Sequence, residues 1–254
     1  MRRFDDKVVL VAGATAGMGR NAAIAFAAAG ANVVISGRRT DLGEATVEHI
    51  EANGGTALFV PTDVANAQDV ERLVGATVDR FGGLDLAYNV AGISGADWTK
   101  PFTDYSEASF DELMAINVKG MFLCMKYEIQ AMLMRGGGAI VNMSSIAGVG
   151  GTPGGGIYVA SKHAVTGMTK ATALEYANQD IRINAVAPGV IYTEMLVEGI
   201  KLAPDLESEM TEKHPIGRLG QMEEVTDAVM WLCSPEASFV TGQTIVIDGG
   251  YTLK

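Results

Sequence analysis

The chain has 254 residues, of which 48% are hydrophobic and 19% are charged, and this balance predicts one globular domain spanning residues 1–254. Its net charge of −11 offers no basic footprint for nucleic acid, so we expect the acidity to serve solubility. Acids interrupt the first apolar run, which argues against a signal peptide, and no apolar run is long enough to cross a bilayer. These features predict a cytoplasmic protein without a membrane partner.

Short apolar runs alternate with longer helical patterns along the whole chain. The helical patterns cover 19–30, 40–53, 66–81, about 106–135, 157–178 and 221–233, with a lid-like segment at 193–214. The strand patterns cover 7–13, 32–37, 56–61, 84–92, 138–145, 181–189 and 244–250. Continuously apolar strands that alternate with helices indicate a parallel sheet covered on both faces. We therefore predict an α/β fold, a three-layer Rossmann-like doubly wound sheet of about seven parallel strands, with ligands at the carboxyl ends of the strands.

Two cysteines, Cys124 and Cys233, both lie in apolar helical patterns. Neither has His or Asp neighbours at the spacing of a metal site, so we predict buried free thiols and no bound metal.

Three glycines follow the first predicted strand, at Gly13, Gly17 and Gly19. Glycines at a strand-to-helix turn permit a tight turn and a close approach of the backbone to a pyrophosphate. The start of the next helix adds free N–H groups and a partial positive charge. This position favours a dinucleotide site, although three glycines at such a turn can also be ordinary turn residues.

Residues at the ends of the next three strands are also expected to contact parts of the dinucleotide. Arg38 and Arg39 follow the second strand, where an acid would hold a ribose hydroxyl and an arginine would accommodate a 2′-phosphate. NADP(H) is therefore favoured, with NAD(H) as the alternative, unless the two arginines form only a solvated loop. Asp63 and Val64 are expected to face an adenine ring. The fourth strand ends at Asn89, Ala91 and Gly92, which are expected to face the ribose and pyrophosphate.

The ordered set of these motifs with Asn117, Ser145, Tyr158-x-x-x-Lys162 and Pro188-Gly189 resembles the single-domain branch of the short-chain dehydrogenase/reductase family. The resemblance covers essentially the whole chain, including the ending TGQTIVIDGG. Met18 stands where the family commonly has isoleucine, and we expect little consequence. For the cofactor, the resemblance implies contacts from Thr15, Ala16 and Met18 in the first loop, and from Pro188, Gly189, Ile191 and Thr193 after the sixth strand.

The resemblance also implies a catalytic group made of Asn117, Ser145, Tyr158 and Lys162. Positions i and i+4 of a helix share a face, so Tyr158 and Lys162 can both point into a cleft. We expect the ammonium and a positively charged nicotinamide to lower the pKa of the phenol by ~2–3 units. Tyr158 would then exchange a proton with the substrate oxygen, Ser145 would orient that oxygen, and Lys162 would also hold the nicotinamide ribose. Asn117 resembles the family's helix-kinking asparagine that supports a water relay to the lysine; alternatively it is a tolerated polar residue.

The predicted activity is therefore hydride transfer between the nicotinamide and a ketone or secondary alcohol of small to medium size. The alternatives are a 3-oxoacyl-thioester reductase, a sugar dehydrogenase and a non-catalytic dinucleotide sensor. Trp98 either edges the substrate cleft or anchors its loop. The lid side chains, which either face the substrate or close against the core, are Met195, Leu196, Ile200 and Leu202. Family members usually form tetramers, and we expect a homotetramer that pairs through 106–135 and 157–178.

Overall fold

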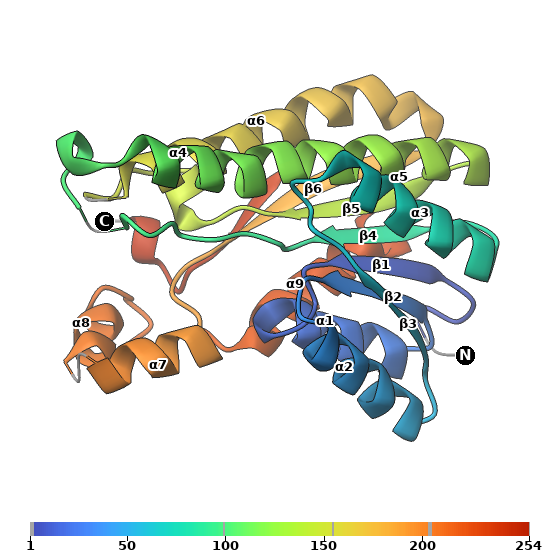
Figure 1. Cartoon of the computed structure of the whole chain (residues 1–254), viewed down its shortest axis with the longest axis horizontal. Helices are drawn as coiled ribbons and strands as arrows, with labels where there is room; N and C mark the ends of the chain where they lie inside the picture. The colour runs from blue at the N-terminus through green and yellow to red at the C-terminus, as the bar shows by residue number, and fades with distance from the viewer. Residues whose placement is uncertain (1–2, 99, 154, 203–204, 254) are drawn as a thin grey trace.

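A seven-stranded parallel sheet forms the centre of the computed structural model, which describes residues 3–98, 100–153, 155–202 and 205–253 (Figure 1). The strand order is β3-β2-β1-β4-β5-β6-β7. The strands β2 and β3 extend the sheet on one side of β1, and β4 to β7 extend it on the other side, so the order of strands reverses between β1 and β4. Such a reversal leaves a crevice at the carboxyl ends of the strands. The strands are β1 (Val8–Ala12), β2 (Asn32–Gly37), β3 (Thr56–Pro61), β4 (Leu86–Asn89), β5 (Gly138–Met143), β6 (Ile181–Pro188) and β7 (Thr244–Ile247).

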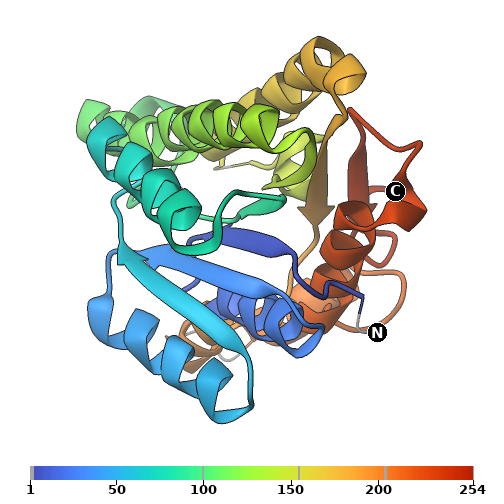
Figure 2. The same cartoon turned by 90° about the vertical axis from the view of Figure 1, so that its right-hand side faces the viewer.

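Helices cover both faces of this sheet, as Figures 1 and 2 show. One layer contains α1 (Gly17–Ala28), α2 (Thr40–Ala52) and α9 (Met222–Cys233). The opposite layer contains α3 (Ala67–Phe81), α4 (Glu107–Met114), α5 (Met121–Arg135) and α6 (Gly156–Tyr176). The predicted three-layer fold is confirmed.

Side chains along each strand point alternately to the two faces of the sheet, so the apolar interior consists of two cores, one on each face. In β1, Val9 and Val11 pack into the core below α1 and α9, whereas Leu10 and Ala12 pack into the core below α3, α5 and α6. Successive side chains of a strand point to opposite faces, so a strand that is covered on both faces is apolar along most of its length. This is why the first strand could be recognised from an unbroken apolar run.

The predicted helix over 106–135 is present, with a π-helical turn in its middle. After α4, residues Ala115–Gly120 form a π-helical turn before α5 begins at Met121. A π-turn inserts one residue into the helical ladder and re-aims the side chains on it. The predicted lid consists of two helices, α7 (Glu194–Leu202) and α8 (Leu206–Glu212), which lie at one end of the molecule (Figure 1).

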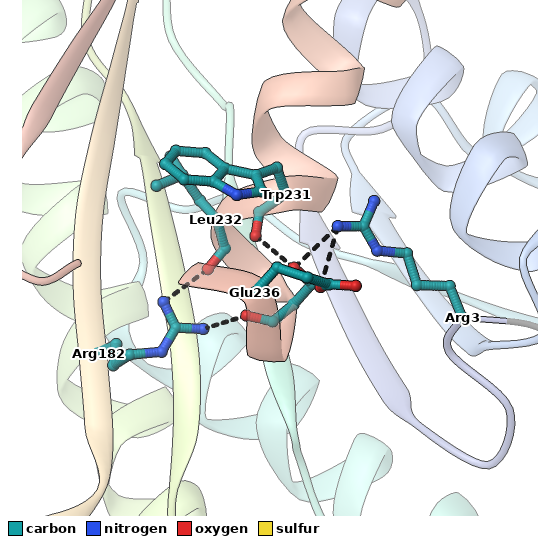
Figure 3. Close-up of polar contacts among 6 residues, drawn as sticks. Arg3, Arg182, Trp231, Leu232 and Glu236 are labelled. Carbon is teal, nitrogen blue, oxygen red and sulfur yellow. Dashed lines mark hydrogen bonds and ion pairs between the residues drawn. The ribbon is translucent and has the colours of Figure 1, made fainter. Parts of the chain in front are cut away.

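A polar clamp closes the carboxyl end of α9 (Figure 3). The guanidinium of Arg182, from β6, donates to the carbonyls of Leu232 and Ser234 at 2.7 and 3.1 Å. Arg3 donates to Ser234 Oγ at 2.9 Å and to Glu236 Oε2 at 3.1 Å. The last carbonyls of a helix lack intrahelical partners, so Arg182 satisfies carbonyls at this end and ties α9 to β6. Arg3 binds side chains that follow α9 and ties this end to the N-terminal segment.

Both cysteines lie in the protein interior. Cys124 and Cys233 are buried free thiols, as predicted. Within the described ranges, none of the helices has the length and apolar character that a membrane span would require.

Candidate active site

The first glycine loop packs closely against the end of β4. Gly13 has φ of +98°, and a Cβ at this position would lie 2.6 Å from the backbone nitrogen of Ala91. A Cβ at Gly19 would collide with the carbonyl of Gly13 and would lie 2.9 Å from Val90 Cγ1. Only glycine allows both approaches, so these residues bring the loop after β1, the start of α1 and the loop after β4 together.

The N-terminus of α1 has no side-chain cap. Its N-cap residue is Ala16, which has no side-chain oxygen, and the first turn contains no acidic residue. The N–H groups at this end are therefore available to an anion, as the first N–H groups of a helix lack intrahelical partners. The side chain of Met18 packs against the core, so a contact from this residue to a cofactor would come from its main chain.

The two arginines after β2 lie beside the first loop. Arg39 Nη2 donates to Thr15 Oγ1 at 3.0 Å, and both Arg38 and Arg39 are exposed. A Cβ at Gly37 would lie 2.6 Å from Thr15 Cγ2, so glycine at the end of β2 makes room for this threonine. The structure thus places Thr15 and Arg39 together.

The ends of β3 and β4 reach the same edge of the sheet. The carboxylate of Asp63 accepts a hydrogen bond from the Ala65 backbone at 3.0 Å, and Val64 is buried close to Gly120. The side chain of Asn89 turns away from this edge into the helix layer, where Asn89 Nδ2 donates to Glu128 Oε2 at 2.8 Å. Only the main chain of Asn89 is left to face the predicted ribose and pyrophosphate.

Lys162 and Tyr158 lie on α6, and Ser145 follows β5. Lys162 is 4% exposed, and its Nζ donates to the carbonyl of Met143 at 3.0 Å. The same nitrogen lies 5.6 Å from the centroid of the Tyr158 ring, while Tyr158 forms a hydrogen bond with Ser145. The neighbouring Ser144 turns the other way and donates to the carbonyl of Lys162 at 3.2 Å. The structure therefore brings the predicted serine, tyrosine and lysine into one group.

Burial governs the pKa values of this group in the protein without cofactor. Burial raises the pKa of Tyr158 above its ordinary value, and the hydrogen bond with Ser145 lowers the pKa only in part. Burial also lowers the pKa of Lys162 to about 8. The predicted acidification of the phenol involves the positively charged nicotinamide as well as Lys162, so it stays a prediction for the complex with cofactor.

Asn117 lies in the π-helical turn and is 2% exposed. Its Oδ1 accepts from the backbone N–H of Ile93 at 2.8 Å, and its Nδ2 donates to the Ile93 carbonyl at 2.8 Å and to Ser161 Oγ at 3.2 Å. A Cβ at Gly92 would lie 3.2 Å from Asn117 Oδ1 and 3.6 Å from Lys162 Nζ. Asn117 thus fixes the loop after β4 beside Lys162.

The segment after β6 joins the sheet to the lid. Gly189 donates from its backbone to the Ile247 carbonyl at 2.9 Å, and Ile191 forms a bridge with Gly220. Thr193 precedes α7, and its Oγ1 accepts from the Leu196 N–H at 3.4 Å. Pro188 ends β6 and is buried. Leu196 and Ile200 are half-buried, while the side chains of Met195 and Leu202 lie outside what the structure describes.

Two residues acquire a role that the sequence did not define. His214 accepts from the Val190 N–H at 3.2 Å and pairs through Nδ1 with the Met210 carbonyl at 2.7 Å, which ties α8 to the segment after β6. A single histidine without a motif gave no signal of this contact.

Trp98 packs edge-to-face on Tyr158, with ring centroids 5.1 Å apart, so Trp98 lies at the border of the site. A Cβ at Gly155 would lie 2.8 Å from the Trp98 ring.

Together these features fit a nicotinamide dinucleotide. A glycine loop without Cβ atoms and an uncapped helix start suit the pyrophosphate, and Tyr158 and Lys162 lie across the same edge of the sheet. When bound, this cofactor supplies or accepts the hydride.

Comparisons with known proteins agree with this fit. A sequence model of a family described as enoyl-(acyl carrier protein) reductase matches residues 13–252. The chain is 43% identical to a 2,5-dichloro-2,5-cyclohexadiene-1,4-diol dehydrogenase of Sphingobium indicum, over 99% of both chains. It is also 43% identical to a cyclohexanol dehydrogenase of an Acinetobacter species, over 99% of this chain and 97% of that protein. The crystal structure of a levodione reductase superposes with a TM-score of 0.92 at 36% identity, over 98% of each chain.

Proposed function

Because the chain belongs to the short-chain dehydrogenase/reductase family and is an oxidoreductase, we propose that it transfers a hydride between NADP(H) and a cyclic ketone or secondary alcohol. The observation that carries this proposal is the convergence of Ser145, Tyr158 and Lys162 at the carboxyl edge of the sheet. A sensor without catalysis has no use for such a group.

Each side chain has a defined task in the proposed reaction. Ser145 holds the substrate oxygen by a hydrogen bond, and Tyr158 gives a proton to that oxygen in reduction or takes it in oxidation. Lys162 binds the nicotinamide ribose and supplies a positive charge that favours the phenolate. Asn117 positions the loop after β4, and Pro188, Gly189, Ile191 and Thr193 line the nicotinamide end of the crevice.

Substitution of Tyr158 by Phe tests the proposal. Tyr158→Phe keeps the ring that packs on Trp98 and removes the proton donor, so turnover should fall by ~10²–10⁴-fold while cofactor binding is retained. Steady-state kinetics with cyclohexanol and cyclohexanone, and titration of cofactor fluorescence, measure the two quantities. Tyr176→Phe, at the other end of α6, is the matched control and should keep full activity. Full turnover by Tyr158→Phe would refute the assignment.

The preference for NADP(H) rests on Arg38 and Arg39. Both are exposed beside the first loop, and Arg39 is positioned by its hydrogen bond to Thr15. Two guanidinium groups and no acid at this place suit a 2′-phosphate. Arg38→Asp should therefore lower kcat/KM for NADP(H) by at least tenfold relative to NAD(H). Arg80→Asp, an equal charge change on α3, should leave the preference unchanged; an unchanged preference in Arg38→Asp would contradict the assignment.

Apolar side chains and the names of two relatives support an apolar ring as the substrate. Trp98 lies against Tyr158, and Leu196 and Ile200 of the lid are half-buried. Two of the relatives are named for cyclic alcohols. The remaining candidates are a 3-oxoacyl thioester and a sugar, and a panel that contains all three classes decides among them by kcat/KM.

We further propose that residues 1–254 act as one dinucleotide-binding and catalytic domain, and that the protein works as a cytoplasmic homotetramer. Exposed apolar side chains support the assembly. They gather on the layer of α4, α5 and α6 and along the edge formed by α9 and β7, and include Phe110, Phe122, Met134, Leu174, Trp231, Phe239 and Val246.

A further inference from the structure

A carboxyl group without a cation partner lies in the interior behind the proposed site. Glu128, on α5, has no exposed surface, and within the described ranges it forms no ion pair. In the part of the chain that the structure describes, its side chain has a single hydrogen-bond partner, Asn89, whose Nδ2 donates to Glu128 Oε2 at 2.8 Å. An ionised carboxylate is very costly in such surroundings unless it is paired, so its protonation state needs an explanation.

Glu128 begins a chain of buried amides and hydroxyls. Asn89 Nδ2 also donates to Asn142 Oδ1 at 3.1 Å, and Asn142 Nδ2 donates to Thr169 Oγ1 at 2.9 Å. All four residues are at most 1% exposed. They belong to α5, β4, β5 and α6, so the chain of hydrogen bonds crosses from one helix through two strands to another helix.

Two acceptors in this network lack a partner among the described residues, namely Glu128 Oε1 and Asn89 Oδ1. They are the remaining oxygens of the same two planar groups that already share one hydrogen bond. An ionised carboxylate has no hydrogen to offer, which would leave both oxygens unsatisfied. A proton on Glu128 Oε1 would supply a donor for Asn89 Oδ1 and would complete a reciprocal acid–amide pair.

We propose that Glu128 is a positioning residue, kept as a neutral carboxylic acid that pairs reciprocally with the Asn89 amide and so fixes the strands behind the catalytic group. Burial raises the pKa of Glu128 to about 7, and the Asn89 hydrogen bond opposes this increase only in part. The neutral form is thus accessible below neutral pH.

The elements that this pair joins are those that carry the site. Beyond Asn89, β4 leads to Gly92, which lies beside Asn117 and Lys162. Beyond Asn142, β5 leads to Met143, whose carbonyl holds the Lys162 ammonium. Thr169 lies two turns from Lys162 on α6. A loss of the Glu128 proton would place an unpaired charge against Asn89 and would loosen these supports together.

The neighbours of Glu128 supply one further titratable group. Cys124 lies one turn earlier on α5, and burial raises the pKa of its thiol, so it stays neutral. Asn89 from β4, Asn142 from β5 and Thr169 from α6 are uncharged. The helix α3 packs on α5 with apolar side chains that include Leu73 and Val74. The ammonium of Lys162 is directed to Met143. A change in the free energy of unfolding near pH 7 that disappears when Glu128 is substituted can therefore be assigned to the Glu128 carboxyl group.

The sign of the pH dependence follows from linkage. An ordinary glutamate titrates at 4.5 and Glu128 at about 7, so the folded state holds this proton more tightly than the unfolded state. The contribution of Glu128 to the free energy of unfolding is fully present below pH 4.5 and decreases as the pH rises from 4.5 to about 7. Above pH 7 this contribution has been lost and does not change further. Over this window the unfolding equilibrium constant should rise by about 300-fold from this group alone.

Glu128→Gln tests the proposal because an amide can reproduce both hydrogen bonds of a neutral acid. Chemical denaturation from pH 5 to 8, without cofactor or substrate, should show that this variant lacks the decline and is at least as stable as the wild type at pH 8. Glu44→Gln, at an exposed site on α2, should keep the wild-type profile. Glu128→Leu should be destabilised at every pH, because it leaves Asn89 unpaired.

Infrared spectroscopy gives a second reading on the wild-type protein. The carbonyl stretch of a buried protonated carboxylic acid should be present at pH 5.5 and should disappear on titration through pH 7. Its absence at pH 5.5, or a Glu128→Gln variant that is less stable than the wild type at pH 8, would overturn the proposal. Both readings are independent of turnover, so they stand apart from the proposed function. If that function holds, the kcat/KM profile of Glu128→Gln should also lose the component near pH 7.

Discussion

At the proposed site, the Lys162 side chain is buried in surroundings that disfavour its charged form. Lys162 is 4% exposed, and burial lowers its pKa to about 8 from 10.5. Its recorded hydrogen-bond partner is one backbone carbonyl, that of Met143. A residue placed so unfavourably for stability is typical of a functional site, where perturbed pKa values cluster. The lysine is therefore expected to be retained for its chemistry.

Lys162→Met should separate stability from function. The folded pKa lies below the unfolded value, so the buried ammonium destabilises the protein fully below pH 8 and ceases to do so as pH rises toward 10.5. The shift corresponds to about 3 kcal/mol, from which the lost hydrogen bond to Met143 subtracts about 1 kcal/mol. We expect the variant to be about 2 kcal/mol more stable at pH 7, with activity reduced at least a hundredfold.

Urea denaturation at pH 7 and initial rates measure the two effects of Lys162→Met. Lys170→Met, which removes an exposed lysine two turns further along α6, is the control for the loss of charge. A Lys162→Met variant that is clearly less stable than the Lys170→Met variant would show that the ammonium supports the fold.

At the scale of elements, the site depends on deviations from regular structure. The π-helical turn Ala115–Gly120 places Asn117 so that its amide meets both backbone groups of Ile93. Neither the residue types nor their periodicity distinguish this turn from an α-helix, because both patterns carry an apolar face. The sequence therefore predicted one helix over 106–135, and only the resemblance to a family indicated a kink at Asn117.

The lid is connected to the sheet by a histidine that periodicity could not identify. His214 is 3% exposed; its Nε2 accepts from Val190, so its Nδ1 carries the hydrogen that is donated to the Met210 carbonyl. A neutral imidazole with this tautomer satisfies both partners at once. The contact joins the last turn of α8 to the segment that follows Pro188, so it holds the second lid helix against the end of β6.

At the scale of the whole molecule, two separate regions with exposed apolar side chains are candidates for subunit contacts. Leu174 of α6 is 84% exposed, and Phe239, after α9, is fully exposed. The strand β7 ends the sheet and leaves one edge of its backbone unpaired. Two such regions on one chain suit the two different contacts of a tetramer with three two-fold axes.

Light scattering checks the proposed assembly. The wild type should have four times the mass of the 26.6 kDa chain, and Leu174→Asp or Phe239→Asp should each reduce the mass toward that of a dimer. Leu42→Asp, on α2, is the control and should keep the wild-type mass, because its region is not part of either proposed contact. A wild-type protein that is monomeric at micromolar concentration would contradict the tetramer.

The sequence by itself determined the layers, the order of elements and the edge of the sheet where the site lies. Strands covered on both faces are apolar along most of their length, and glycines are required where backbones approach closely, so both features are written into local composition. The grouping of Ser145, Tyr158 and Lys162 followed from a resemblance, and the structure places these residues together.

Only the tertiary structure decided how the polar groups are charged and to what they are bound. Burial, rather than the neighbouring ammonium, sets the pKa of Tyr158 in the protein alone, and the Asn89 side chain turns to Glu128 instead of the crevice. Desolvation and hydrogen-bond pairing depend on residues that are far apart in the chain, 39 positions for Asn89 and Glu128. Local sequence patterns carry no information about such contacts until the strands and helices have packed.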